Sequence, residues 1–96
     1  MATAYEVTYI IRPNLEETEV DERSNKIAEQ LKASGAEIGE IEKLGKRRLA
    51  YEIDDLREGH YVVMKFNSNA AQAKELERQL RLDETVMREL LIKLDD

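Results

Sequence analysis

Cysteine is absent from the 96 residues, and histidine occurs once. A chain without thiols can form no disulfide, cysteine nucleophile or thiolate metal site, and it fits a reducing compartment such as the cytoplasm. His60 is the only imidazole that could act as a general base, and it stands at the start of an apolar segment typical of a strand. The possible nucleophiles are serines in helix or cap contexts, namely Ser24, Ser34 and Ser68. We therefore expect no enzyme, no catalytic residue, no metal and no cofactor.

Long apolar runs are also missing, since no segment approaches the roughly 18 residues that a membrane-spanning helix needs. Residues 1–5 are uncharged and precede Glu6, a pattern that fits neither a secretory signal nor an arginine-rich transit peptide. The composition, 42% hydrophobic and 38% charged, is typical of a soluble globular protein. The length predicts one domain spanning residues 1–96.

Apolar residues alternate with polar ones over residues 5–12, which predicts a half-buried strand that ends at Pro13. Asn14 stands three residues before Glu17, the spacing of a capping box, and so predicts a helix over about 15–34. Gly35 supplies the left-handed conformation that commonly ends a helix. The acidic residues in the first turns of this helix match the positive end of the helix dipole, and they lack the ligand spacing of a metal site.

The second half of the chain predicts three strands and one helix. Residues 36–53 read as a long strand that bends or bulges at a glycine, followed by a turn over 54–59. The strand over 60–66 is apolar on both faces, which indicates a central position in the sheet. Asn69 and Gln72 form a second capping pair before a helix over 70–82. A last strand is expected over 85–94, without an assignment of its faces.

The order of strand, helix, strand, strand, helix and strand predicts an α+β fold of the ferredoxin-like βαββαβ type. Right-handed connections then place both helices on one face of a four-stranded antiparallel sheet. The expected core packs helix residues against strand residues: Ile27, Leu31, Leu76 and Leu80 against Val7, Ile11, Met64 and Phe66. The other face of the sheet is left uncovered, with Ile10, Tyr61 and Val63 on it. An exposed apolar patch of this kind indicates a partner, although scattered surface apolar residues would explain it as well.

Positive charge is concentrated in one segment of a chain whose net charge is −6. Residues 43–48 carry four cations in six positions, and Arg78, Arg81, Arg88 and Lys93 extend the basic set. Arginine can donate two hydrogen bonds to one phosphate, so the cluster favours RNA binding. Cations that protect an edge strand from pairing are the alternative. The excess negative charge would weaken indiscriminate binding, which favours RNA recognition through shape and a partner.

Several motifs taken together resemble one family over essentially the whole chain. They are Tyr5-Glu6, Pro13-Asn14-Leu15, the segment Gly45-Lys46-Arg47-Arg48-Leu49-Ala50-Tyr51, Gly59-His60-Tyr61 and Val86-Met87-Arg88. This combination closely resembles the family of bacterial ribosomal protein six of the small (30S) subunit. The resemblance implies a structural ribosomal protein in the cytoplasm that helps to build the platform of the small subunit and supports translation.

The resemblance also implies the partners and the surface that meets them. By it, the chain pairs with small-subunit ribosomal protein eighteen, and the two bind small-subunit ribosomal RNA, with no membrane and no small-molecule substrate involved. The expected RNA-binding residues are Lys46, Arg47, Arg48, Arg88 and Lys93. The expected partner-binding residues are Tyr51, Tyr61 and Val63.

Two other functions share this order of elements. An RNA-recognition domain would stack bases on two or three aromatic residues of the central strands, whereas here only Tyr61 is expected on the open face. A regulatory module that dimerises and binds an amino acid would explain an uncovered sheet face, but it would not explain the basic residues 43–48. Stabilisation by amino acids would favour the module, and salt-sensitive RNA binding that needs a partner would favour the ribosomal function.

Overall fold

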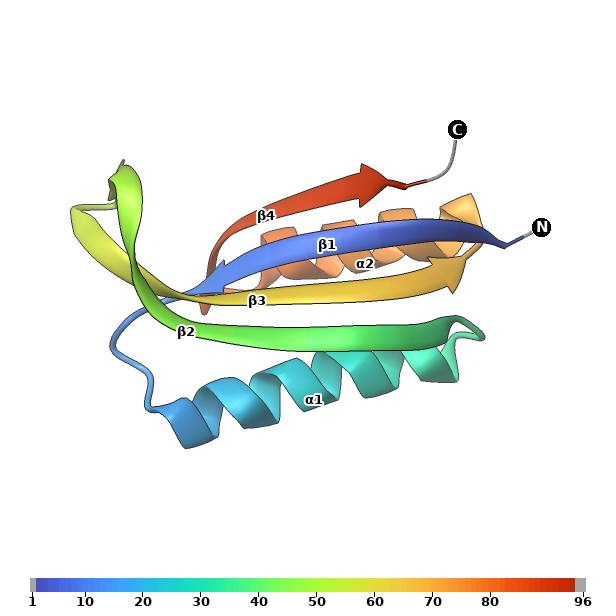
Figure 1. Ribbon diagram of the computed structural model, residues 1–96, viewed down its shortest axis with the longest axis horizontal. Helices are drawn as coiled ribbons and strands as arrows, with labels where there is room; N and C mark the ends of the chain where they lie inside the picture. Colours follow the sequence, from blue (N-terminus) through green and yellow to red (C-terminus); the bar gives the residue numbers. More distant parts are fainter. Residues whose placement is uncertain (1, 95–96) are drawn as a thin grey trace.

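The computed structural model describes residues 2–94 and confirms the predicted order of elements (Figure 1). The elements are β1 (Thr3–Ile11), α1 (Glu17–Ala33), β2 (Glu37–Ile53), β3 (Leu56–Ser68), α2 (Ala70–Leu82) and β4 (Val86–Lys93). All strand pairs are antiparallel, in the order β2-β3-β1-β4, so β3 and β1 are central as expected for β3. Both helices lie on the same face of the sheet. The fold is therefore the α+β, ferredoxin-like one.

The core lies between the sheet and the two helices. In β1 the alternate residues Val7, Tyr9 and Ile11 are fully buried on the helix side. They pair across the sheet with residues of the same face, as when Val7 lies opposite Met64 of β3 and Leu91 of β4. The predicted core is confirmed at Leu31, Leu76, Leu80, Val7, Ile11, Met64 and Phe66, while Ile27 is half-buried against it.

The two helix starts differ in how well the sequence predicted them. Asn69 caps α2 as expected, because its side chain accepts a hydrogen bond of 2.8 Å from the Gln72 backbone. The predicted cap of α1 at Asn14 is wrong: α1 begins at Glu17, and Glu16 forms the capping box with Glu19. Pro13 and Asn14 form a turn that lets Leu15 pack against the core, so the chain reaches the helix axis two residues later.

The turn predicted over 54–59 exists but is shorter than expected, because β3 begins already at Leu56. The turn consists of Asp54 and Asp55, whose φ angles of 51° and 63° lie in the left-handed region. A two-residue turn of this kind matches the twist of a hairpin, and a short polar side chain such as Asp tolerates the conformation. β2 and β3 consequently continue beyond the rest of the sheet, since the last pair between β1 and β3 is Ile11 with His60. We call the projecting hairpin, residues 47–59, the arm.

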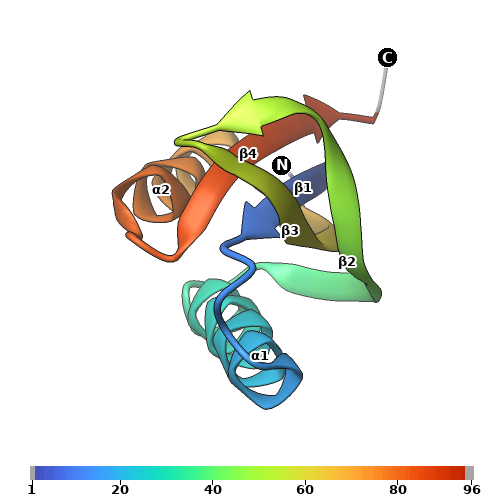
Figure 2. The same cartoon turned by 90° about the vertical axis from the view of Figure 1, so that its left-hand side faces the viewer.

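The arm bends over the sheet because β2 is irregular at its glycines, as predicted. The pairing of β2 with β3 shifts around Gly39 and again just before Gly45, whose φ is +84°. Figure 2 shows β2 rising from the sheet and arching back over the face that carries no helix. The uncovered face of the sheet is therefore shorter than the sequence predicted.

Candidate nucleic-acid and protein interface

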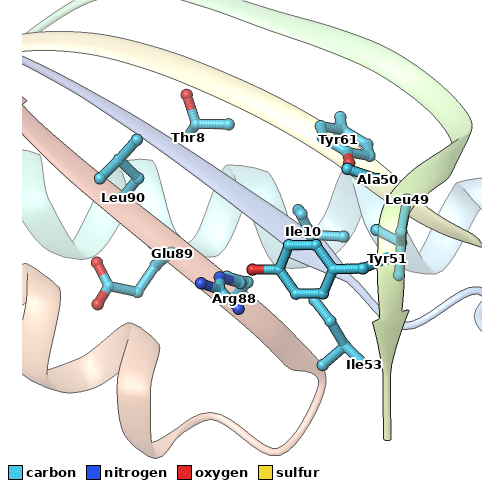
Figure 3. A pocket seen from close by; sticks show the side chains of 10 residues that line it. All are labelled: Thr8, Ile10, Leu49, Ala50, Tyr51, Ile53, Tyr61, Arg88, Glu89 and Leu90. Carbon is cyan, nitrogen blue, oxygen red and sulfur yellow. The ribbon is translucent and has the colours of Figure 1, made fainter. Parts of the chain in front are cut away.

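The face without helices has a hollow between the sheet and the arm. The sheet contributes Ile10 at its floor, and the arm contributes Leu49, Tyr51 and Ile53 (Figure 3). The hollow measures about 200 Å³ and its lining is largely apolar. Ile10, expected on an uncovered face, is only 8% exposed, because the arm lies over it. This end of the face is partly covered by the chain itself.

Two predicted site residues meet at this hollow. The guanidinium carbon of Arg88 on β4 lies 5.2 Å from the centre of the Tyr51 ring on the arm, a cation–π arrangement. Tyr61, another predicted partner residue, also lines the hollow, in the same cross-strand row as Ile10 and Arg88. The structure therefore brings a residue expected to bind RNA into contact with one expected to bind the partner.

The rest of the face remains open and mixes apolar residues with the polar Glu6, Thr8 and Lys65. Val63, the third predicted partner residue, lies next to the hollow, in the row of Thr8 and Leu90. Leu90 is 59% exposed and Ile92 is 42% exposed, both on β4. The sequence did not assign these two residues to a face. The pairing register of β4 with β1 assigns Leu90 and Ile92 to the open face, because it puts Leu90 opposite Thr8 and Ile92 opposite Glu6.

The predicted RNA-binding residues share one property, which is that none of the five forms an ion pair with a described residue. All five are exposed: Lys46, Arg47, Arg48, Arg88 and Lys93. Seven other cations are neutralised by carboxylates: Arg12, Arg23, Lys43, Arg57, Lys65, Arg78 and Arg81. Lys43 belongs to the basic segment 43–48 but carries no free charge, because its Nζ lies 3.2 Å from a carboxylate oxygen of Asp21 on α1.

The five cations do not form one continuous surface. Arg47 and Arg48 are neighbours on the arm, opposite Gly59 and Glu58, so their side chains leave opposite sides of the hairpin ribbon. Lys46 lies at the base of the arm, opposite His60. Lys93 lies at the other end of β4 from Arg88, about 17 Å away along the strand at the usual rise per residue. Lys46, Arg47 and Arg48 are therefore consecutive at the base of the arm, Arg88 lies beside Tyr51 of the arm, and Lys93 stands apart.

His60 has a structural environment. Its side chain is buried, and its Nε2 atom lies 3.0 Å from the Leu15 carbonyl oxygen, so the ring connects β3 to the loop before α1. Within residues 2–94, no three His, Asp or Glu side chains are grouped to hold a metal ion. No helix of that part of the chain is long and apolar enough to cross a membrane.

Aromatic side chains on the central strands are placed unfavourably for stacking RNA bases. Tyr9 and Phe66 are buried on the helix side, and Tyr5 stacks on Phe66 there with 5.5 Å between ring centres. Among the aromatic residues of β1 and β3, Tyr61 alone shares the open face. One aromatic residue does not make the platform of two or three on which RNA-recognition domains depend.

These features define a class of protein: a ferredoxin-like domain with an open sheet face and a hairpin arm that carries exposed cations at its base. The family model of ribosomal protein S6 matches residues 4–93. The chain belongs to the ribosomal protein S6 family. It is accordingly a structural, non-enzymatic constituent of the small ribosomal subunit and part of the cytoplasmic ribosome.

Individual relatives agree with this assignment. The chain is 45% identical over 93 residues to the small ribosomal subunit protein bS6 of Natranaerobius thermophilus, which covers 97% of each chain. It is 44% identical to the bS6 of Desulfitobacterium hafniense, over 97% of this chain and 98% of the relative. The crystal structure of the 30S ribosomal protein S6 from Thermotoga maritima superposes with a TM-score of 0.90 at 28% identity, covering 97% of this chain and 88% of that one.

Proposed function

We propose that this chain, acting as one domain over residues 1–96, binds small-subunit ribosomal RNA together with small-subunit ribosomal protein eighteen and so supports assembly of the platform. The observation that carries the proposal is the set of exposed cations without ion pairs next to an open sheet face on which Leu90 and Ile92 are exposed. Cations that no carboxylate neutralises keep their full charge for phosphate. Apolar residues on an open sheet face gain free energy when a protein covers them.

The basic residues at the base of the arm are the proposed RNA-binding element. Lys46, Arg47 and Arg48 are consecutive in β2, and all three are exposed and form no ion pair with a described residue. The negative net charge of −6 opposes binding to RNA at large, so a second protein that adds charge or shape is needed for stable binding. Arg88 lies beside the arm, and Lys93 would bind separately at the far end of β4.

The proposed surface for protein eighteen is the open sheet face. Tyr61 and Val63 of this face and Tyr51 of the arm are the expected partner-binding residues, and the exposed Leu90 and Ile92 extend the surface along β4. The face is formed by hydrogen-bonded strands, and a preformed surface loses less entropy when a partner docks on it. The contact of Arg88 with Tyr51 joins this surface to the arm, so RNA bound at the base of the arm would lie beside protein eighteen bound on the sheet face.

The test replaces both arm arginines, Arg47→Ala with Arg48→Ala, in the full chain. A matched control is Lys26→Ala with Lys32→Ala, since these two cations are also exposed and form no ion pair with a described residue, but lie on α1. Both double variants lose the same charge. Stability should change by less than about 0.5 kcal/mol in either, because the side chains are exposed.

The measurement is a titration of a platform fragment of small-subunit RNA in the presence of protein eighteen, at several salt concentrations. We expect the arm variant to bind more weakly, with a salt dependence that is lower by about one for each phosphate that the arm no longer neutralises. The α1 variant should bind as the parent does. Equal binding by the arm variant and the parent would remove these arginines from the RNA-binding surface.

A further inference from the structure

Arg12, the first residue after β1, connects the tip of the arm to the loop between α2 and β4. Its Nε donates a hydrogen bond of 2.8 Å to the Glu84 carbonyl oxygen, and a terminal guanidinium nitrogen lies 3.4 Å from Asp54 Oδ2. The Arg12 backbone N–H donates a further bond of 2.8 Å to the Thr85 carbonyl, which fixes the root of this side chain. One side chain therefore bridges two segments that lie far apart in the sequence.

The arm has few other attachments that hold it over the sheet. Beyond Ile11 it no longer pairs with β1, and between the pairs Arg48–Glu58 and Ile53–Leu56 the register of its own strands is interrupted. At its base Gly45 has a φ of +84° and no atom within 4 Å of the position that a Cβ would occupy. The other attachments are the buried Leu49, the close approach of the buried Gly59 to Ile10, and the stacking of Arg88 on Tyr51. An arm attached at so few points depends on each of them.

We propose that Arg12 is a positioning residue for the docking surface, because it fastens the tip of the arm and thereby sets the shape of the hollow and the direction of the basic cluster. The inference rests on the function proposed above and concerns the same surface. The arm carries Arg47 and Arg48 together with Leu49, Tyr51 and Ile53 of the hollow. A fastened arm presents these residues in one arrangement, so docking costs less conformational entropy.

The turn of the arm offers a matched pair of variants. Asp54→Asn removes the charge that faces Arg12, and Asp55→Asn removes the charge of the next residue, which forms no ion pair with a described residue. Both positions have left-handed φ angles that asparagine tolerates, and both variants change the net charge equally. Arg12→Ala removes the hydrogen bond to Glu84 as well. The comparison therefore separates the Arg12 interaction from turn geometry and from overall charge.

Backbone ¹⁵N order parameters over residues 49–58 measure the fastening directly in the free protein. We expect values near 0.85, typical of a rigid backbone, in the parent and in Asp55→Asn. Asp54→Asn and Arg12→Ala should lower them towards the flexible range below about 0.6. Affinity for protein eighteen should then fall about twofold to fivefold in these two variants and stay unchanged in Asp55→Asn, as expected for removal of an exposed ion pair.

Unchanged order parameters in both Arg12→Ala and Asp54→Asn would overturn the inference. Lower order parameters with unchanged affinity would overturn its positioning part, since the fastening would then have no bearing on docking. A parent protein that fails to bind protein eighteen would instead contradict the proposed function. Failure of the proposed function can be told apart from failure of the Arg12 inference, because the order parameters are measured in the free protein.

Discussion

Leu31 shows what a single side chain contributes to the rigidity of the sheet. It lies on α1, is 5% exposed, and packs in the core cluster between the helices and the central strands. Leu31→Ala should lower the free energy of unfolding by about 2 to 5 kcal/mol, as expected for truncation of a buried leucine. Denaturant unfolding measures this, with the exposed neighbour Lys32→Ala as control at less than about 0.5 kcal/mol. An unchanged midpoint in the leucine variant would place the core elsewhere.

Tyr9 makes the stability depend on pH in the alkaline range. Burial, assisted by the negative charge of Asp83, raises the pKa of its hydroxyl from 10.0 to about 12. Below pH 10 the hydroxyl is protonated in both the folded and the unfolded chain, so the full stability is present. Above it the unfolded chain loses the proton first, and the free energy of unfolding falls as pH rises to about 12.

The size of this loss follows from the shift in pKa and amounts to about 2 to 3 kcal/mol. Denaturant unfolding of the parent and of Tyr9→Phe between pH 8 and pH 11.5 isolates it from the other groups that titrate there. The parent should lose stability more steeply than the phenylalanine variant. Parallel curves for the two proteins would show that the hydroxyl ionises in the folded protein as easily as in the unfolded one.

Residue types predicted the core better than the interface. Period-two alternation in β1 was enough to place Val7 and Ile11 on the helix side, because a strand exposes successive side chains to opposite faces. Leu90 and Ile92 could not be placed in this way, since β4 is apolar at several neighbouring positions. Their face depends on the register with β1, a long-range property that no short segment contains.

The N-terminal cap of α2 tests the structure at the scale of one element. Asn69 accepts a hydrogen bond from the Gln72 backbone, so Asn69→Ala should lower the free energy of unfolding by about 1 kcal/mol. Asn14→Ala is the matched control, because Asn14 lies in the turn before α1 and does not cap it. Thermal unfolding should show a lower midpoint for the Asn69 variant alone. A larger effect of Asn14→Ala would indicate that Asn14 caps α1, as the sequence predicted.

The arm is the element that the sequence failed to predict. The run from Asp54 to Gly59 is polar and charged, which is typical of a loop, and no propensity indicates two consecutive aspartates in left-handed conformations. β2 and β3 pair along almost their whole length, up to Ile53 with Leu56, and this pairing leaves only two residues for the turn. The helices were predicted to within two residues because their apolar stripes, and the Asn69 cap of α2, are local, whereas the arm is a property of the tertiary structure.

At the scale of the whole molecule, opposite charges lie close together where the arm begins. The start of α1 carries Glu16, Glu17 and Glu19, which suit the positive end of the helix dipole, and Lys46 lines the same pocket as Glu16 and Glu17. The cations without ion pairs are therefore a local feature of an acidic molecule, and the proposed RNA binding depends on them. The composition alone could not say which nucleic acid or partner they would bind. The family motifs, spread over the chain, provided the ribosomal hypothesis.

The most direct measurement of the central claim is a gel-shift titration of a platform fragment of small-subunit RNA at two salt concentrations. The RNA is titrated with this protein, with protein eighteen, and with both. We expect tight binding only with both proteins, and weaker binding at the higher salt concentration. Unaided binding of single-stranded RNA by this protein, or no binding by the pair, would contradict the claim that it recognises RNA jointly with protein eighteen.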